Sequence, residues 1–271
     1  MKDSRIAQGG LVLLGCGKMG SAMLAGWLAR DLPPQAVWVV DPNPSDWLRG
    51  TGVHLNTELP ETPALVLVAV KPQMMAEALP TLRAMGNGRT VFVSVAAGIT
   101  IGGLSAILGA QTPIVRAMPN TPAAISQGIT AIVGNDAAGT QALEEAETLL
   151  SAVGDVIRLT EEAQIDAVTG VSGSGPAYVF HMIETMAAAG VAEGLPEEVA
   201  LQLATATVAG AGALAAASDE GPDVLRRNVT SPNGTTQAAL EVLMEPQSGF
   251  PALLRRAVGA AADRSRELAN G

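Results

Sequence analysis

Apolar and polar positions along the first half of the chain follow the pattern of strands that alternate with helices. Six apolar runs have the length of buried strands, and they lie at residues 11–14, 37–40, 65–70, 91–95, 114–117 and 129–133. Stretches of helical periodicity separate them, at about residues 18–30, 73–85, 101–108 and 140–153. A last short strand is predicted at residues 156–159. This alternation predicts βαβ units and therefore an α/β fold with a doubly wound sheet of the Rossmann type.

The second half of the chain has a different pattern. From about residue 161 onward the strand-like runs disappear, and four Ala-rich helical stretches are broken by Gly and Pro at residues 173–176, 194–196, 231–234 and 249–251. We predict a dinucleotide-binding Rossmann domain at residues 1–162 and an all-α domain for substrate binding and dimerisation at residues 163–271. Helices at about residues 197–217 and 235–270 are too apolar to stand exposed, which predicts a homodimer or a higher homo-oligomer.

A glycine-rich segment follows the first predicted strand directly and opens a helix. It reads Gly15-Cys16-Gly17-Lys18-Met19-Gly20, which is the G-x-G-x-x-G pattern in the context that dinucleotide binding requires. The glycines allow a tight turn and a close approach of the backbone to a pyrophosphate, and the helix N-terminus stabilises its charge. Asp41 ends the second predicted strand, where a carboxylate accepts a hydrogen bond from a ribose hydroxyl. The alternative is a glycine-rich turn that holds no ligand.

The choice between NADH and NADPH stays open at this level. Asp41 favours NADH because its charge repels a 2′-phosphate, whereas Asn43, Ser45 and Asn56 carry groups that donate to one. Cys16 is expected to fill space in the loop rather than to act as a redox centre.

Three further strand ends carry candidate contacts, because ligands of open α/β sheets bind at the carboxyl ends of the strands. Lys71 follows a buried run and precedes Pro72, which predicts a contact to the cofactor ribose or phosphate; the alternative is a charge that faces solvent. Small residues at positions 96–98 leave space for the nicotinamide half of the cofactor. Asn120 is a candidate polar contact at the next strand end.

The segment Val229-Thr230-Ser231-Pro232-Asn233-Gly234-Thr235-Thr236 places short hydroxyl side chains where a long helix begins. Backbone N–H groups at such a helix N-terminus bind a small carboxylate, and the hydroxyls serve a neighbouring nitrogen or oxygen. A second helix start follows Ser174 and Gly175, with Pro176 at its first position. The two N-termini together are expected to bind a carboxylate without an arginine; the alternative for each is an ordinary capped helix start.

Four segments are similar in order and spacing to pyrroline-5-carboxylate reductases, over nearly the whole chain. They are VAVKP at residues 68–72, VRAMPNTP at 115–122, DAVTGVSGSGPAY at 166–178, and the stretch at 230–236, of which the last two are highly specific. The resemblance implies a Rossmann domain followed by a helical domain that dimerises through interlocking helices. It further implies NAD(P)H-dependent reduction of 1-pyrroline-5-carboxylate to L-proline, the final step of proline synthesis.

Site residues of the family are carried over position by position. The hydroxyl beside the substrate nitrogen falls on Thr236. The family's cofactor contacts fall on the loop Gly15, Cys16, Gly17, Lys18, Met19 and Gly20, and on Asn56, Val70, Lys71, Ala97 and Asn228. Asp41 is a further predicted cofactor contact, because of its position at the end of the second strand. The predicted substrate contacts are Ser174, Gly175, Ser231, Asn233, Gly234, Thr235 and Thr236. An acidic position falls on Glu161 or Glu162.

One departure from the family concerns the turn before Thr235. The family usually has Gly-Gly where this chain has Asn233-Gly234. Asn tolerates left-handed backbone angles better than most residues, so the turn is expected to persist. Glu220 is a candidate for buffering the site through water, and His54 and His181 are expected to be a surface residue and an ordinary helix residue.

Composition and charge limit the classes of partner that the protein is expected to bind. The net charge is −10 and no basic cluster exceeds the arginine pairs at 226–227 and 255–256, so nucleic acid is not an expected partner. A single cysteine excludes an internal disulfide and a cysteine-built zinc site, and no metal is expected. Residues 199–218 carry no charge, but their Ala, Thr and Gly content predicts a helix packed on other helices rather than a membrane span. With no signal-peptide pattern at the start, a cytoplasmic protein is expected.

Two other functions are compatible with parts of the pattern. A 3-hydroxyacid dehydrogenase also joins a Rossmann domain to a helical one, but it generally needs a lysine in the second domain, and this chain has only Lys2, Lys18 and Lys71. A non-enzymatic, nucleotide-binding dimeric scaffold would require the stretch at 230–236 to be a helix cap and nothing more.

Overall fold

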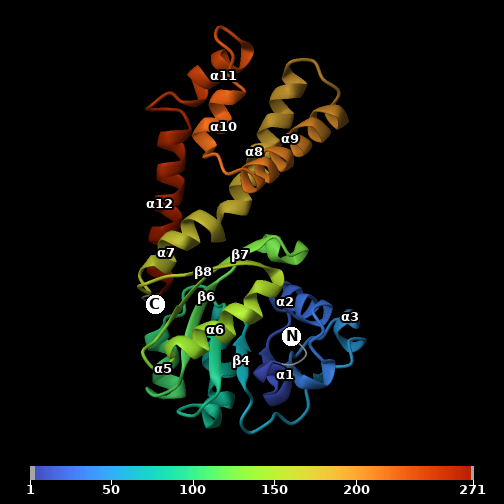
Figure 1. The fold of residues 1–271 in the computed structure, drawn as a ribbon, viewed down its shortest axis with the longest axis vertical. Coiled ribbons are helices and arrows are strands. Elements are labelled where there is room, and N and C mark those ends of the chain that lie inside the picture. Colours follow the sequence, from blue (N-terminus) through green and yellow to red (C-terminus); the bar gives the residue numbers. More distant parts are fainter. Residues whose placement is uncertain (1–3, 270–271) are drawn as a thin grey trace. The chain divides into compact units, whose positions relative to one another are not determined.

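In the computed structural model, which describes residues 4–269, the first part of the chain forms one eight-stranded sheet (Figure 1). The strands are β1 (Leu11–Leu14), β2 (Val37–Val40), β3 (His54–Leu55), β4 (Leu65–Val68), β5 (Val91–Ser94), β6 (Ile114–Met118), β7 (Gly128–Gly134) and β8 (Gly154–Arg158). Their order is β3-β2-β1-β4-β5-β6-β7-β8, and only the β6–β7 pair is antiparallel. This confirms the predicted Rossmann-type sheet.

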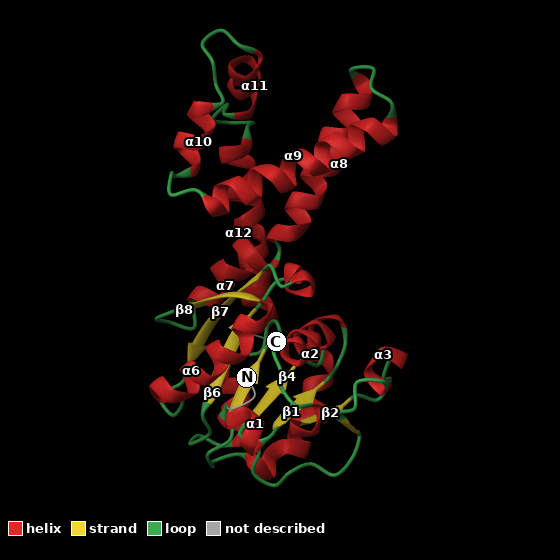
Figure 2. Cartoon of the chain, turned by 45° about the vertical axis from the view of Figure 1, so that its right-hand side comes forward, coloured by secondary structure: helices red, strands yellow, loops and turns green. Residues whose placement is uncertain are grey.

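Helices cover both faces of the sheet (Figure 2). They are α1 (Arg5–Gly9), α2 (Lys18–Ala29), α3 (Asp46–Arg49), α4 (Met75–Ala78), α5 (Ile101–Leu108), α6 (Gly139–Leu150) and α7 (Gln164–Val168). In β1, Leu13 packs with Trp27 of α2 on one face, and Leu14 packs with Leu104 of α5 on the other. Strands β1 and β4 are buried and apolar at every position, which explains why continuous apolar runs located them.

The structure corrects the predicted helix at residues 73–85. Only α4 is α-helical there, and 3-10 turns at Pro72–Met74 and Leu79–Met85 flank it. Pro80 lacks an N–H and its ring opposes continuation of the α-helix, which accounts for the break. The short elements α1, α3 and β3 were not predicted, because two to five residues are too few to show a periodicity.

The second part of the chain is helical. It contains α8 (Gly175–Ala192), α9 (Glu197–Ala217), α10 (Pro222–Asn228), α11 (Thr235–Leu243) and α12 (Phe250–Ala269). The chain divides into two compact units, with residues up to Gly173 and from Ala261 in one, and Ser174–Ala260 in the other. The last turns of α12 thus pack in the sheet unit, where Ser265 Oγ donates to Asp166 Oδ1 of α7 at 2.6 Å. The domain limits 1–162 and 163–271 remain a prediction.

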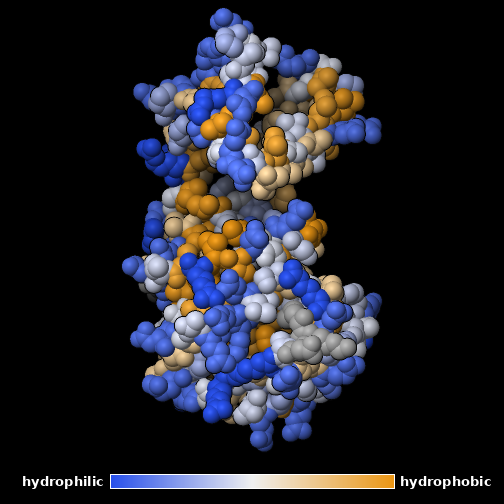
Figure 3. All heavy atoms as spheres, in the orientation of Figure 1, coloured by the Kyte–Doolittle hydropathy of each residue, from blue (hydrophilic) through white to orange (hydrophobic). Residues whose placement is uncertain are grey.

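The helical unit leaves much apolar surface exposed (Figure 3). Leu203 and Leu214 of α9 are 53% and 57% exposed, and Val242 of α11 is 72% exposed. Helix α9 is long and apolar enough to cross a membrane by length and composition, and only 11% of that window is buried in one chain. An apolar surface of this extent indicates an interaction with another surface.

Candidate functional site

The glycine-rich loop connects β1 to α2. Gly15 has φ +89°, and its N–H donates to the Val40 carbonyl at 2.8 Å. A Cβ atom at Gly15 would lie 3.0 Å from the Ala69 carbonyl oxygen, and one at Gly20 would lie 2.4 Å from the Gly15 carbonyl oxygen. The fold itself therefore requires Gly15 and Gly20.

Gly17 differs from the other two glycines of the loop. It is the exposed N-cap of α2, its φ is −70°, and a Cβ atom there would meet nothing within 4 Å. Neither backbone conformation nor packing in the protein requires glycine at this position. The open space lies at the N-terminus of a 12-residue helix, where an anion is stabilised by N–H groups and by the helix dipole.

Asp41 is fixed at the end of β2, beside the loop. Its Oδ2 accepts from the Cys16 N–H at 2.7 Å, and its Oδ1 accepts from the Asn43 N–H at 2.8 Å. The Asn56 side chain bonds the Asp41 backbone twice, accepting from its N–H at 2.9 Å and donating to its carbonyl at 2.8 Å. The predicted cofactor residues Cys16, Asp41 and Asn56 therefore form one hydrogen-bonded group.

The Cys16 side chain is only partly exposed. Burial raises the pKa of its thiol to about 11, and the Asp41 charge adds to the effect. Because the raised pKa favours the protonated form, the thiolate forms only as the pH approaches 11. This agrees with a space-filling role.

The rate of alkylation of Cys16 tests whether the pKa of its thiol is raised. We expect iodoacetamide at pH 7.5 to modify Cys16 on the order of 10²-fold more slowly than an unperturbed thiol. The rate should rise with pH and level off only near pH 11. The same protein in guanidinium chloride is the control, because unfolding returns the thiol to its ordinary pKa. Rapid labelling of the folded protein at pH 7.5 would contradict the burial of the thiol.

Other predicted cofactor residues lie at the same edge of the sheet. Val70 is buried and lies against Gly15, whereas Lys71 and Ala97 are exposed beyond the carboxyl ends of β4 and β5. Because β1, β4 and β5 are neighbouring parallel strands, their carboxyl ends lie together. Asn120 also has a role in the fold, since its Oδ1 accepts from the Ile129 N–H at 2.9 Å at the start of β7.

The hydroxyl-rich segment forms the turn before α11. Asn233 has φ +56°, as expected for a residue that tolerates left-handed angles, and its N–H donates to Gln237 Oε1 at 2.8 Å. Gly234 is the N-cap of α11 and supplies no side chain to its first-turn N–H groups. Ser231 Oγ lies over Gly234, where a Cβ atom would be only 2.5 Å from it. Thr235 and Thr236 form the first turn of the helix.

The other predicted residues of the helical unit lie on α8 and α10. Ser174 is the N-cap of α8, Gly175 is its first residue, and Ser174 makes no side-chain capping bond. Asn228 ends α10 and donates from Nδ2 to Glu220 Oε2 at 3.0 Å, so these two candidates are partners. Within the helical unit, the first turns of α8 and α11 lie far apart in both views (Figures 1 and 2). One chain by itself does not bring the two N-termini together.

Sequence reasoning missed a buried arginine on β6. Arg116 is 3% exposed, and its Nη1 donates to Glu162 Oε1 at 2.7 Å. The same Glu162 oxygen accepts from the Ile101 N–H at 2.8 Å, while Glu161 is exposed. Of the two acidic candidates, Glu162 is thus the one whose side chain hydrogen-bonds to β6 and to the start of α5. An arginine within the apolar run of β6 was the available signal.

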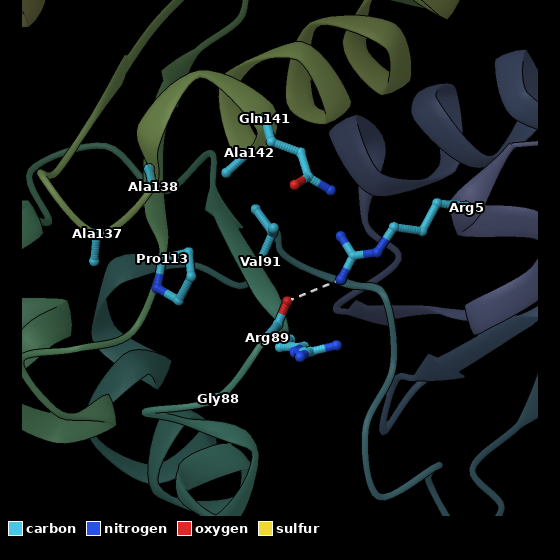
Figure 4. Close-up of a pocket in the computed structure, with 9 residues that line it drawn as sticks. All are labelled: Arg5, Gly88, Arg89, Val91, Pro113, Ala137, Ala138, Gln141 and Ala142. Atoms are coloured by element: carbon cyan, nitrogen blue, oxygen red, sulfur yellow. Dashed lines mark hydrogen bonds between the residues drawn. The ribbon is translucent and has the colours of Figure 1, made fainter.

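A surface pocket lies at the opposite end of the strands (Figure 4). Its lining includes Arg89 and Val91 at the start of β5 and Pro113 before β6, and Arg5 donates to the Arg89 carbonyl at 3.0 Å. No predicted site residue lines this pocket, so it is separate from the candidate site.

Known proteins resemble the chain in both of its parts. Residues 162–268 match a family model described as pyrroline-5-carboxylate reductase dimerisation, and residues 10–98 match one described as NADP oxidoreductase, coenzyme F420-dependent. A pyrroline-5-carboxylate reductase of Pseudomonas aeruginosa is 40% identical over 265 residues, which is 96% of each chain.

Solved structures agree with the sequence comparison. One of a pyrroline-5-carboxylate reductase from Coxiella burnetii has a TM-score of 0.90 at 31% identity, covering 96% of this chain and 98% of that one. One of pyrroline carboxylate reductase from Plasmodium falciparum with NADP bound has a TM-score of 0.83 at 26% identity, with the same coverage of each chain.

Proposed function

Because the chain belongs to the pyrroline-5-carboxylate reductase family, we propose that it reduces 1-pyrroline-5-carboxylate to L-proline with NAD(P)H. The observation that carries this is the 40% identity over 96% of both chains, which spans the glycine-rich loop and the helical part alike. Oxidation of NAD(P)H that depends on 1-pyrroline-5-carboxylate tests it. Oxidation with a 3-keto acid instead would favour a hydroxyacid dehydrogenase, and no oxidation with any cyclic imine would favour a scaffold.

The dinucleotide fits the carboxyl edge of the sheet. Open space at Gly17 and the N-terminus of α2 accommodate a pyrophosphate, and Asp41 lies where the adenosine ribose is expected. Lys71, Ala97 and, from the helical unit, Asn228 are proposed as further contacts, with Val70 shaping the loop. The cofactor supplies the hydride when bound.

The imino acid is proposed to bind at the first turn of α11. The N–H groups that follow Gly234 bind its carboxylate, with Ser231, Asn233 and Thr235 around it. Thr236 orients the ring nitrogen and relays a proton that comes from water. Hydride addition to the C=N carbon and protonation of nitrogen then give a C–H bond and an amine N–H. Positioning of the two reactants supplies most of the rate.

The chain forms a homo-oligomer through its dimerisation domain. We propose that this is at least a homodimer and that the substrate site lies near its interface. The first turns of α8 and α11 lie far apart within one chain. We propose that Ser174 and Gly175 meet the α11 turn of another copy instead. A second copy, rather than lipid, is proposed to cover the exposed face of α9. We propose a cytoplasmic location and no membrane partner, and the net charge of −10 argues against binding to nucleic acid.

Cofactor choice follows from the surroundings of Asp41. We expect the KM for NADH to be about tenfold below that for NADPH, because a fixed carboxylate beside the ribose repels a 2′-phosphate. Asp41→Ser should remove this preference. Asp46→Ser, which removes an exposed acid from α3, is the matched control and should leave it unchanged. A lower KM for NADPH in the unmodified protein would contradict the assignment.

A further inference from the structure

Arg116 places a charge in the interior, and its partner Glu162 keeps 31% of its side chain exposed. Besides the bond from Nη1 to Glu162, the Nε and Nη2 atoms of Arg116 have no partner, and they are the only such buried side-chain nitrogen or oxygen atoms in the part of the chain that the structure describes. Unpartnered buried donors are costly, and replacing a buried ion pair with apolar side chains is often neutral or stabilising. A role in stability alone therefore does not account for the pair.

Glu162 connects the pair to the start of α5. One oxygen, Oε1, accepts from both Arg116 Nη1 and the Ile101 N–H, which is the first N–H of the helix. Thr100 caps the same turn by accepting from the Gly103 N–H at 3.1 Å. A carboxylate at a helix N-terminus is stabilised by the helix dipole. One oxygen atom thus links the start of α5 to β6, beside the packing of Leu104 and Leu108 on Ile114.

The segment that runs from β5 into α5 is held at both ends. At its start, the Ala96 N–H donates to Ser94 Oγ at 3.4 Å, and Ser94 is the register neighbour of Arg116. At its end, Glu162 holds Ile101. In its middle, Gly98 has φ +73° and lies against Leu268 of α12, with 3.1 Å between the Leu268 Cβ and a Cβ built on Gly98. Ala97, at the tip of this segment, is exposed at the carboxyl edge of the sheet.

We infer that Arg116 and Glu162 are positioning residues for the nicotinamide half of the cofactor, acting through the segment at residues 95–100. This inference rests on the proposed function, which places the nicotinamide at Ala97. The pair lies remote from the glycine-rich loop in the sheet order, since β6 is separated from β1 by β4 and β5. Replacing the pair should therefore weaken binding of the nicotinamide half of the cofactor and leave binding of the adenosine half unchanged.

Comparing two ligands tests this without an activity assay. In Arg116→Met we expect the Kd for NADH to rise about tenfold, while the Kd for ADP-ribose, which lacks the nicotinamide, stays unchanged. Arg116→Lys should restore most of the NADH affinity, because an ammonium still pairs with Glu162. Arg158→Met is the matched control: Arg158 also pairs with a glutamate, Glu147, but on the surface, and both Kd values should stay unchanged.

A second variant separates positioning from folding. Arg116→Met combined with Glu162→Gln leaves no buried charge, so it should unfold at or above the Tm of the unmodified protein while keeping the selective loss of NADH affinity. An unchanged Kd for NADH in this folded variant, or parallel losses for NADH and ADP-ribose, would overturn the inference. Failure of the unmodified protein to bind either ligand would overturn the proposed function and the inference with it.

Discussion

Replacing Thr236 with Ala is expected to lower kcat roughly 10²-fold, the range of a lost acid–base contact. The hydroxyl sits in the first turn of α11, and we propose that it holds the imine nitrogen and relays its proton. The KM for the imino acid should change less, because the carboxylate is held by backbone N–H groups that the substitution leaves in place. Steady-state kinetics with saturating cofactor measures both parameters.

Two further substitutions make the Thr236 result specific. Thr236→Ser keeps the hydroxyl and should retain kcat within a few-fold. Thr148→Ala removes an exposed hydroxyl from α6, where it bonds the Glu144 carbonyl, and should leave kcat unaltered. A kcat for Thr236→Ala equal to that of the unmodified enzyme would refute the proposed role.

Gly17→Ala is expected to raise the Kd for NAD(P)H by on the order of 10²-fold, because a methyl group would fill the space through which a pyrophosphate approaches the backbone. Thermal stability should not fall, since φ is −70° and no atom lies within 4 Å of the added Cβ. Titration of cofactor fluorescence together with a Tm measurement tests both parts.

Gly20→Ala is the informative contrast. Its Cβ would approach the Gly15 carbonyl oxygen to 2.4 Å, so this variant should lose about 1–3 kcal/mol of stability as well as cofactor affinity. If Gly17→Ala binds NAD(P)H as tightly as the unmodified protein, the pyrophosphate does not lie at this loop.

The sequence was most informative where local rules decide the structure. The bounds of β1 and β2 agree with the predicted runs, because both strands consist only of apolar residues. The left-handed angle at Asn233 followed from turn chemistry, which is likewise local.

Contacts between distant positions were not visible in the sequence. Arg116 and Glu162 are 46 positions apart, and neither lies in a pattern that points to the other. The return of α12 to the sheet unit through Ser265 and Asp166 spans 99 positions. For α9, the composition predicted that the helix packs against other helices. In a single chain, however, most of the helix is exposed.

We propose that the first turn of α11 meets the reducing face of the dinucleotide and binds an imino acid there. A crystal structure of the oligomer with oxidised cofactor and L-proline tests it most directly. We expect Thr236 Oγ at about 3 Å from the proline nitrogen, with the proline ring facing the nicotinamide. Proline bound elsewhere, with Thr236 remote from the nicotinamide ring, would contradict it.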